Sequence, residues 1–211
     1  MRAEVITLRD GSPAPATVAA GITGVVLAPG GDQRFAGVDK GLIPIGGRAL
    51  IKRVLEQLLK QVKQIVIVAG RNSMLYSAYG YRVLPAGQEN PNPLSAMATA
   101  LAVVDTTHAL FVPADAGRLP ADLGARLWQA HSQRDGAPCV VLSADGALPE
   151  CCLIARSERA SIEQALAAGR SLTEWLASRK AVEVDFREWP PLFWGLSSPK
   201  DVATLEDALL R

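Results

Sequence analysis

A glycine-rich segment near the start of the chain carries the residue types that bind phosphate. Residues 27–40 read Leu-Ala-Pro-Gly-Gly-Asp-Gln-Arg-Phe-Ala-Gly-Val-Asp-Lys, which combines glycines with the cations Arg34 and Lys40. The segment follows the apolar run 22–28, which is short and rich in β-branched residues and therefore predicts a buried parallel strand. The amide groups of such a loop and two cations can together surround a polyphosphate.

Two familiar glycine motifs do not fit this loop. A Walker loop ends in Gly-Lys-Ser/Thr at the start of a helix, whereas residues 41–47 (Gly-Leu-Ile-Pro-Ile-Gly-Gly) separate Lys40 from the first helical pattern. A dinucleotide fold places its helix directly behind the glycines and usually has an acid after the second strand, where this chain has Gly70 and Arg71. A different kind of phosphate site and an ordinary surface loop are the two interpretations left.

The second candidate for chemistry is Asp115, which follows the apolar run 110–114. Ligands of open parallel sheets bind beyond the carboxyl ends of the strands, so a carboxylate there faces the same edge as the glycine loop. Mg²⁺ prefers one or two carboxylates together with phosphate oxygens and water. We predict that Asp115 binds Mg²⁺, and the alternative is a turn or helix-capping role ahead of Gly117.

These residues need a sheet to position them, and the rest of the sequence predicts one. Apolar runs with strand character alternate with helical periodicity, which is clearest over residues 50–62, where apolar residues recur at spacings of three and four. This order predicts a three-layer α/β/α fold with a mostly parallel sheet. The expected strands are 22–28, 65–68, 82–84, 108–113, 138–142, 150–155 and 182–185, and the expected helices are 50–62, 73–79, 93–104, 120–133, 158–168, 172–179 and 199–210.

Length and composition limit the class of protein. With 211 residues, 49% of them hydrophobic, the chain suits one domain, which we place at residues 21–211. Residues 1–20 include the proline-rich stretch 11–17 and are expected to form a flexible extension. A formal charge of +1 gives no field that favours nucleic acid or a membrane surface. Three cysteines, no export signal and no apolar run of membrane-spanning length indicate a cytoplasmic protein.

Taken together, the motifs resemble those of the molybdenum cofactor guanylyltransferases. The resemblance rests on residues 22–28, then Arg34-Phe35, then residues 37–42 (Gly-Val-Asp-Lys-Gly-Leu). Further positions that match in order and approximate spacing are Arg71, Pro93-Leu94, Pro113-Ala114-Asp115 and Ser198-Pro199. The resemblance covers residues 22–210 and implies a Rossmann-like nucleotidyltransferase fold of the nucleotide-diphospho-sugar transferase type.

The same resemblance implies an activity and its participants. The enzyme would transfer GMP from GTP to molybdopterin that carries molybdenum, with Mg²⁺ as cofactor and pyrophosphate as the second product. Lys40 and Arg34 would be catalytic residues on the phosphates, and Asp115 would bind the metal. Molybdoenzymes or other proteins of cofactor biosynthesis are the implied partners. The implied nucleotide-binding residues are Leu27, Ala28, Gly30, Gly31, Lys40 and Arg71.

Several positions depart from the family pattern and mark the chain as a divergent member. Pro29 stands where the family usually has glycine, and proline has no N–H to donate. Ala86 replaces an aspartate near the nucleotide, residues 195–197 (Gly-Leu-Ser) replace an Asn-x-Asn motif, and Gly70 or Val68 replaces an asparagine after the second strand. Each lost hydrogen bond of this kind costs roughly 1 to 3 kcal/mol unless another residue replaces it. Candidate replacements are Asp32, Gln33, residues 88–90 and Ser95.

These departures leave two alternatives to an active guanylyltransferase. One is a catalytically impaired or non-catalytic relative that binds a nucleotide or a partner protein. The other is a nucleotidyltransferase with another nucleoside triphosphate or acceptor. Trp189, Phe193 and Trp194 either line an acceptor cleft or serve in packing. His108 and His131 are expected to be structural.

Overall fold

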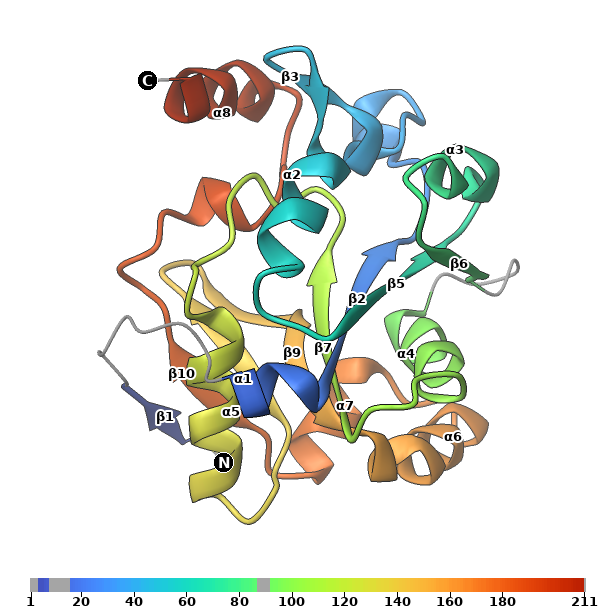
Figure 1. Ribbon diagram of the computed structural model, residues 1–211, viewed down its shortest axis with the longest axis vertical. Helices are drawn as coiled ribbons and strands as arrows, with labels where there is room; N and C mark the ends of the chain where they lie inside the picture. Colours follow the sequence, from blue (N-terminus) through green and yellow to red (C-terminus); the bar gives the residue numbers. More distant parts are fainter. Residues whose placement is uncertain (1–3, 8–15, 87–91, 211) are drawn as a thin grey trace.

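The computed structural model describes residues 4–7, 16–86 and 92–210, with an eight-stranded sheet at its centre (Figure 1). The strand order is β1-β10-β8-β9-β7-β2-β5-β6. β9 is antiparallel to both neighbours and the other pairs are parallel, so the predicted mostly parallel sheet is confirmed. The strands of this sheet are β1 (Val5–Ile6), β2 (Ile22–Ala28), β5 (Gln64–Ala69), β6 (Arg82–Pro85), β7 (His108–Pro113), β8 (Cys139–Ser143), β9 (Gly146–Ala155) and β10 (Val182–Asp185).

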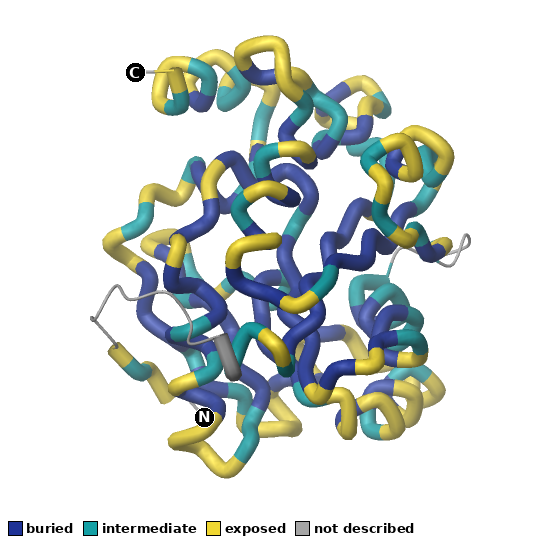
Figure 2. The backbone as a smooth tube through the Cα atoms, viewed as in Figure 1, coloured by how far each residue is buried: buried dark blue, intermediate teal, exposed yellow. Residues whose placement is uncertain are grey.

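Helices cover both faces of the sheet, as a three-layer fold requires. α2, α3 and α5 contribute buried residues to the core on one face, and α4, α6 and α7 contribute to the core on the other. The central strands are buried, while the edge strands and the outer faces of the helices carry exposed residues (Figure 2). The helices are α1 (Ala16–Ala20), α2 (Leu50–Leu58), α3 (Ser73–Ser77), α4 (Pro93–Leu101), α5 (Leu123–Gln133), α6 (Arg159–Ala167), α7 (Leu172–Ser178) and α8 (Lys200–Leu210).

The side chains of β2 divide between the two cores. Ile22, Val26 and Ala28 belong to the core that contains α2, whereas Val25 and Leu27 belong to the core that contains α4. A strand covered on both faces needs apolar residues on both sides, which explains the continuous apolar run. All seven residues of β2 are buried, which confirms the predicted strand.

The register of β2 and β7 brings the candidate residues to one edge of the sheet. Leu27 pairs with Pro113 in the parallel ladder, so both strands end at the same level. The glycine loop leaves β2 directly after this pair, and Asp115 follows β7 two residues after it. The glycine loop and Asp115 are about 80 residues apart in the sequence, but the fold places them at the same edge of the sheet.

β9 is irregular where it passes this edge. Its partner residues in β8 are consecutive, Val140 and Val141, but they pair with Cys152 and Leu148. Residues 149–151 therefore bulge out of the ladder. A bulge of this kind redirects side chains and is common beside binding sites.

The expected loose extension over residues 1–20 differs from the structure in two places. Val5–Ile6 forms β1, a parallel partner of β10, and the Thr7 hydroxyl donates to the Asp185 carboxylate at 3.1 Å. Ala16–Ala20 forms the short helix α1. A two-residue edge strand has no periodicity by which the sequence could predict it. Most of the proline-rich stretch lies outside the described residues.

The other expected strands and helices are present, with ends that differ by a few residues. The helix predicted over 50–62, for example, ends at Leu58. The sequence did not predict the small hairpin of β3 (Pro44–Ile45) and β4 (Arg48–Ala49), which packs against α8. Within the three described ranges, no helix has both the length and the apolar character needed to cross a membrane.

Candidate nucleotide and metal site

The glycine loop closes on itself directly after β2. Gly31 forms an isolated antiparallel bridge with Asp39, and the Asp32 amide donates to the Val38 carbonyl oxygen at 3.2 Å. A Cβ atom at Gly31 would lie 2.1 Å from the Gly37 carbonyl oxygen. The two arms of the loop approach so closely that position 31 requires glycine.

A cavity of about 330 Å³, here called the loop cavity, lies against this loop. Five of the six nucleotide-binding candidates line it, namely Leu27, Ala28, Gly30, Gly31 and Lys40. The sixth, Arg71, is exposed, and its backbone lies beside Gly30 outside the lining. Ser95 and Ala86 also line the loop cavity, whereas residues 88–90 lie outside the described part of the chain.

Two departures from the family pattern, Pro29 and Gly70, are structurally linked. The Gly70 amide donates to the Ala28 carbonyl oxygen at 2.9 Å. A Cβ atom at position 70 would lie only 2.2 Å from the Pro29 carbonyl oxygen. An asparagine at position 70 would therefore collide with the loop in its present conformation.

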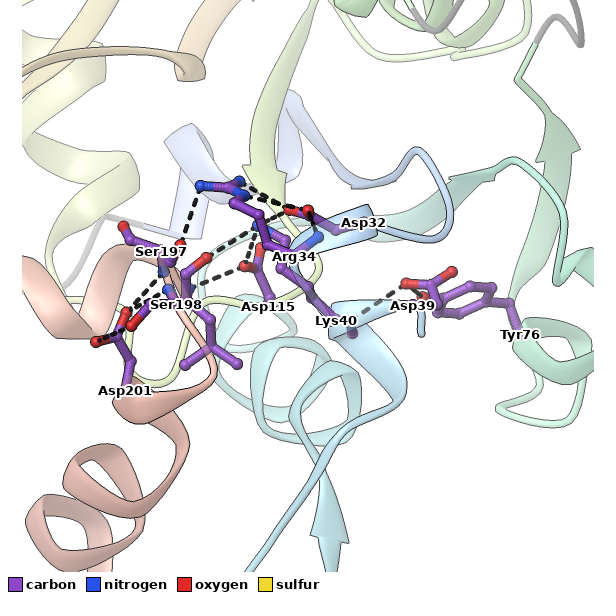
Figure 3. A network of polar contacts seen from close by, with 11 residues as sticks. Asp32, Arg34, Asp39, Lys40, Tyr76, Asp115, Ser197, Ser198 and Asp201 are labelled. Carbon is purple, nitrogen blue, oxygen red and sulfur yellow. Dashed lines mark hydrogen bonds and ion pairs between the residues drawn. The ribbon is translucent and has the colours of Figure 1, made fainter. Parts of the chain in front are cut away.

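Lys40 and Asp115 form an ion pair at the centre of the site (Figure 3). The Lys40 Nζ atom lies 2.9 Å from Asp115 Oδ2, and the two side chains are 24% and 9% exposed. Lys40 Nζ also donates to the Leu196 carbonyl oxygen at 3.1 Å, while the Leu196 amide donates to Asp115 Oδ2 at 2.9 Å. The fold thus brings together two candidate residues that the sequence places after two separate strands.

Arg34, the second catalytic candidate, lies at the rim with a side chain that is 62% exposed. Its guanidinium donates to both carboxylate oxygens of Asp32, at 3.1 and 2.7 Å, and to the Ser197 carbonyl oxygen at 3.0 Å. The hydrogen bonds from Arg34 hold the pKa of the Asp32 carboxyl below its ordinary value. Arg34 must exchange or share these contacts to bind a phosphate.

The segment 195–197, which replaces the Asn-x-Asn motif, contacts the site through its backbone. Its carbonyl groups accept hydrogen bonds from Lys40 and Arg34, and one of its amides donates to Asp115. At Gly195 a Cβ atom would lie 3.2 Å from Asp115 Oδ2, so the segment packs tightly against the carboxylate. Backbone groups therefore hold the three charged candidates in place.

The first turn of α8 fixes this segment. The Asp201 carboxylate accepts from the amides of Ser197 and Ser198, each at 2.8 Å, as the dashed lines in Figure 3 mark. Leu205 of the same helix packs in one buried cluster with Phe35 of the glycine loop. α8 thus links the loop after β2 to the chain that follows β10.

Asp39, the residue before Lys40, is held by Tyr76 of α3. The Tyr76 hydroxyl donates to Asp39 Oδ1 at 2.7 Å, and the Gly41 amide donates to the same oxygen at 3.3 Å. Burial, together with this bond to Asp39, raises the pKa of Tyr76 above its ordinary value, so the phenol stays protonated and remains a donor. The sequence does not predict this role of Tyr76, because one tyrosine on a short helix carries no motif.

An open cavity of about 750 Å³, here called the outer cavity, adjoins the charged residues. Arg34, Lys40 and Asp115 line it on one side, and Lys40 lines the loop cavity as well. Of the three aromatic candidates, Trp194 lies in its lining. Trp189 instead donates to the Arg118 carbonyl oxygen at 2.9 Å, and Phe193 packs in the cluster below α8.

Glu150, on the bulge of β9, lines both cavities and was not among the sequence candidates. Burial, and after it the negative charge of Asp115, raises the pKa of its carboxyl, while Lys40 acts in the opposite direction. The only sequence signal was an acid after Pro149 in an otherwise apolar strand.

The oxygen atoms at this edge suit a hard divalent cation. Within the described ranges, no three His, Cys, Asp or Glu side chains form a group that would hold a metal on their own. Asp115 lines the outer cavity, and its Oδ1 atom makes no hydrogen bond to another described residue. This donor set fits Mg²⁺, which takes one or two carboxylates and completes its shell with phosphate and water.

His108 and His131 contact one another far from this edge. Their Nε2 atoms lie 3.0 Å apart, and His131 Nδ1 lies 2.9 Å from the Ala137 carbonyl oxygen. Trp128 packs edge-on against His108. These contacts agree with the structural role expected for both histidines.

The fold, the loop after β2 and the acid after β7 define the class of protein. A solved structure of molybdopterin-guanine dinucleotide biosynthesis protein A from Archaeoglobus fulgidus superposes with a TM-score of 0.70 at 18% identity, covering 88% of this chain and 97% of its own. Rv0371C of Mycobacterium tuberculosis H37Rv, solved in complex with manganese, superposes with a TM-score of 0.63 at 18% identity and covers 90% of this chain and 100% of its own. The fold is that of the Rossmann-like nucleotidyltransferases.

Sequence comparison narrows the class to a family. Residues 24–183 match the MobA-like NTP transferase domain. The molybdenum cofactor guanylyltransferase of Shewanella halifaxensis (strain HAW-EB4) is 32% identical over 191 residues, which are 89% of this chain and 95% of the relative. The chain belongs to the molybdenum cofactor guanylyltransferase family, as its motifs indicated.

Proposed function

We propose that the protein transfers GMP from GTP to molybdopterin carrying molybdenum, with release of pyrophosphate. The observation that carries this proposal is the meeting of Lys40 and Asp115 at 2.9 Å between the loop cavity and the outer cavity. A nucleotide in the loop cavity and an acceptor in the outer cavity would have their phosphates at this point. Identity of 32% with a molybdenum cofactor guanylyltransferase supports GTP and a molybdopterin as the two substrates.

The residues of the site divide the work of phosphoryl transfer. Bound Mg²⁺ would neutralise charge on the triphosphate, and Asp115 would hold it; the manganese complex of a protein with the same fold supports a divalent cation. Lys40 binds the phosphates, and its positive charge stabilises the negative charge that develops on the departing pyrophosphate. The amides of Gly30 and Gly31 make no hydrogen bond to another described residue and are free to bind phosphate oxygens. Most of the catalysis is then positioning and charge neutralisation.

The contacts of segment 195–197 support an active enzyme despite the lost Asn-x-Asn motif. Its backbone groups fix Lys40, Arg34 and Asp115, so the catalytic arrangement does not depend on those amide side chains. Ala86 is different, because it leaves an apolar wall in the loop cavity where the family has an acid. This position favours the second candidate function, a nucleotidyltransferase or nucleotide-binding relative with a different base.

We place the protein in the cytoplasm, with molybdoenzymes or other proteins of cofactor biosynthesis as its partners. The three cysteines are free and buried, which fits a reducing compartment.

A transfer assay tests the proposed function. The protein is incubated with Mg²⁺, GTP labelled at the α-phosphate, and molybdopterin with molybdenum, and both the labelled dinucleotide and pyrophosphate are measured. We expect equal amounts of the two products, which depend on the acceptor. Transfer from CTP or ATP in preference to GTP would support the second candidate, and no transfer from any nucleotide would contradict enzymatic activity.

A further inference from the structure

Glu150 is a carboxylate that the proposed mechanism does not yet use. It lies in the wall shared by the loop cavity and the outer cavity, together with Lys40. Among the described residues, its carboxylate has no hydrogen-bond or ion-pair partner, in contrast to Asp32 and Asp115. An acid without an ion-pair partner at the junction of two cavities, partly removed from solvent, either takes up a proton or is stabilised as a carboxylate by a cation that binds beside it.

The topology brings Glu150 toward Asp115. The last pair of the antiparallel β7–β9 ladder is Phe111 with Cys152, and Glu150 lies two residues beyond it, at the end of the ladder where β7 continues to Pro113. Asp115 follows two residues after Pro113. Glu150, Asp115 and Lys40 all line the outer cavity.

The bulge explains why this carboxylate can face the site. Residues 149–151 have no partners in β8, because Val140 and Val141 pair with residues on either side of them. The irregularity frees Glu150 from the ladder at the edge where the glycine loop lies. A regular strand would have packed this position against its neighbours.

We propose that Glu150 is a second carboxylate for the divalent cation that Asp115 binds. The inference rests on the proposed function, since it assumes that a nucleotide brings a cation to this edge. Two carboxylates, one from β9 and one from the turn after β7, together with phosphate oxygens, match the preferences of Mg²⁺ and Mn²⁺. The cation would also give the Glu150 carboxylate a direct ion-pair partner, which none of the described residues provides.

The test measures cation affinity directly. Free Mn²⁺ is followed by electron paramagnetic resonance while protein with saturating GTP is titrated. E150Q should raise the dissociation constant for Mn²⁺ about tenfold, the equivalent of roughly 1.4 kcal/mol, and D115N should raise it at least as much. E150D, which keeps the charge on a shorter side chain, should recover part of the affinity. D135N, a change in an exposed acid on the turn after α5 that lines neither cavity, is the control and should leave the affinity within about twofold of wild type.

Metal-free GTP binding and thermal melting complete the design. E150Q should bind GTP in EDTA as wild type does and melt at a similar temperature, because the charge and not the fold is altered. Loss of Mn²⁺ affinity in D115N with wild-type affinity in E150Q would overturn the role of Glu150 alone. No Mn²⁺ or GTP binding by wild type would overturn the proposed function, and with it this inference.

Discussion

The Nζ atom of Lys40 lies 2.9 Å from Oδ2 of Asp115, so the predicted phosphate-binding cation and the predicted metal-binding acid neutralise one another. The Leu196 backbone bridges the same two side chains. A nucleotide with its cation gives each group a partner of opposite charge, and the ion pair then opens without leaving a buried charge unpaired. Before the substrate binds, the ion pair stabilises both charged side chains, and each of them can then bind a substrate group of opposite charge.

Replacement of Lys40 by alanine tests this relationship. Because Lys40 supplies one charged hydrogen bond, K40A should weaken GTP binding by roughly 1.5 to 3 kcal/mol. Turnover should fall further, since the charge on the leaving pyrophosphate is greatest in the transition state. Calorimetry measures the GTP affinity, and the transfer assay measures the turnover. K60A, a change in an exposed lysine beyond α2, is the control. GTP affinity indifferent to K40A would mean that the nucleotide binds elsewhere.

Gly31 offers a test of the loop conformation. Because a Cβ atom would lie 2.1 Å from the Gly37 carbonyl oxygen, G31A must open the loop. We expect GTP affinity to fall by about tenfold or more, with a smaller effect on the unfolding free energy because the loop lies outside the sheet. G124A is the control, since a Cβ atom at Gly124 would meet its nearest neighbour at an ordinary 3.6 Å. Equal GTP affinity in G31A and wild type would show that the loop does not hold the nucleotide.

Tyr76 is expected to position Lys40 through Asp39. Y76F removes the donor to Asp39 Oδ1 and leaves a buried carboxylate with the long bond from Gly41, at a cost of roughly 1 to 3 kcal/mol in unfolding free energy. Urea unfolding measures this cost. GTP affinity, measured without urea, should fall as well. Y79F is the control and should change neither the unfolding free energy nor the GTP affinity, because the hydroxyl that bonds Asp39 belongs to Tyr76. A destabilised Y76F that binds GTP normally would limit Tyr76 to folding.

The paired histidines predict loss of stability in weak acid. Burial, and then the charge of His131, lowers the pKa of His108 from 6.5 to about 4. A base with a lower pKa in the folded state contributes its stability above pH 6.5, and that contribution is lost as the pH falls from 6.5 toward 4. Unfolding free energies at about pH 7 and about pH 5 should differ by on the order of 1 kcal/mol from this source. H108Q should show a smaller difference; an equal difference would assign the effect to other groups.

The sequence predicted the parts of the fold that have a period or a motif. The run 22–28 and the stripe over 50–62 were enough to place β2 and α2, and the order of elements predicted the layers. β1 was missed because two residues on a sheet edge carry no pattern. The antiparallel direction of β9 could not be predicted either, since a buried strand has the same composition whether it runs parallel or antiparallel to its neighbours.

Prediction of the site was limited by contacts that only the fold creates. Lys40 and Asp115 were found because each follows a strand, and parallel strands end at one edge. Glu150 comes from an antiparallel strand and reaches this edge through a bulge, which follows from no local pattern. The sequence also does not predict the backbone contacts of segment 195–197, because every residue type has main-chain donors and acceptors and only the fold decides what they bind.

The most direct test of the proposed guanylyltransferase is calorimetric titration of the protein with GTP, CTP and ATP in the presence of Mg²⁺. Base and cation are measured in one experiment, and repetition in EDTA isolates the contribution of the metal. We predict that GTP binds at least about tenfold more tightly than CTP or ATP, and that the D115N variant loses the Mg²⁺ dependence but keeps its fold. Absence of nucleotide binding at millimolar concentration, or a preference for CTP or ATP, would contradict the assignment of this chain as a GTP-dependent transferase.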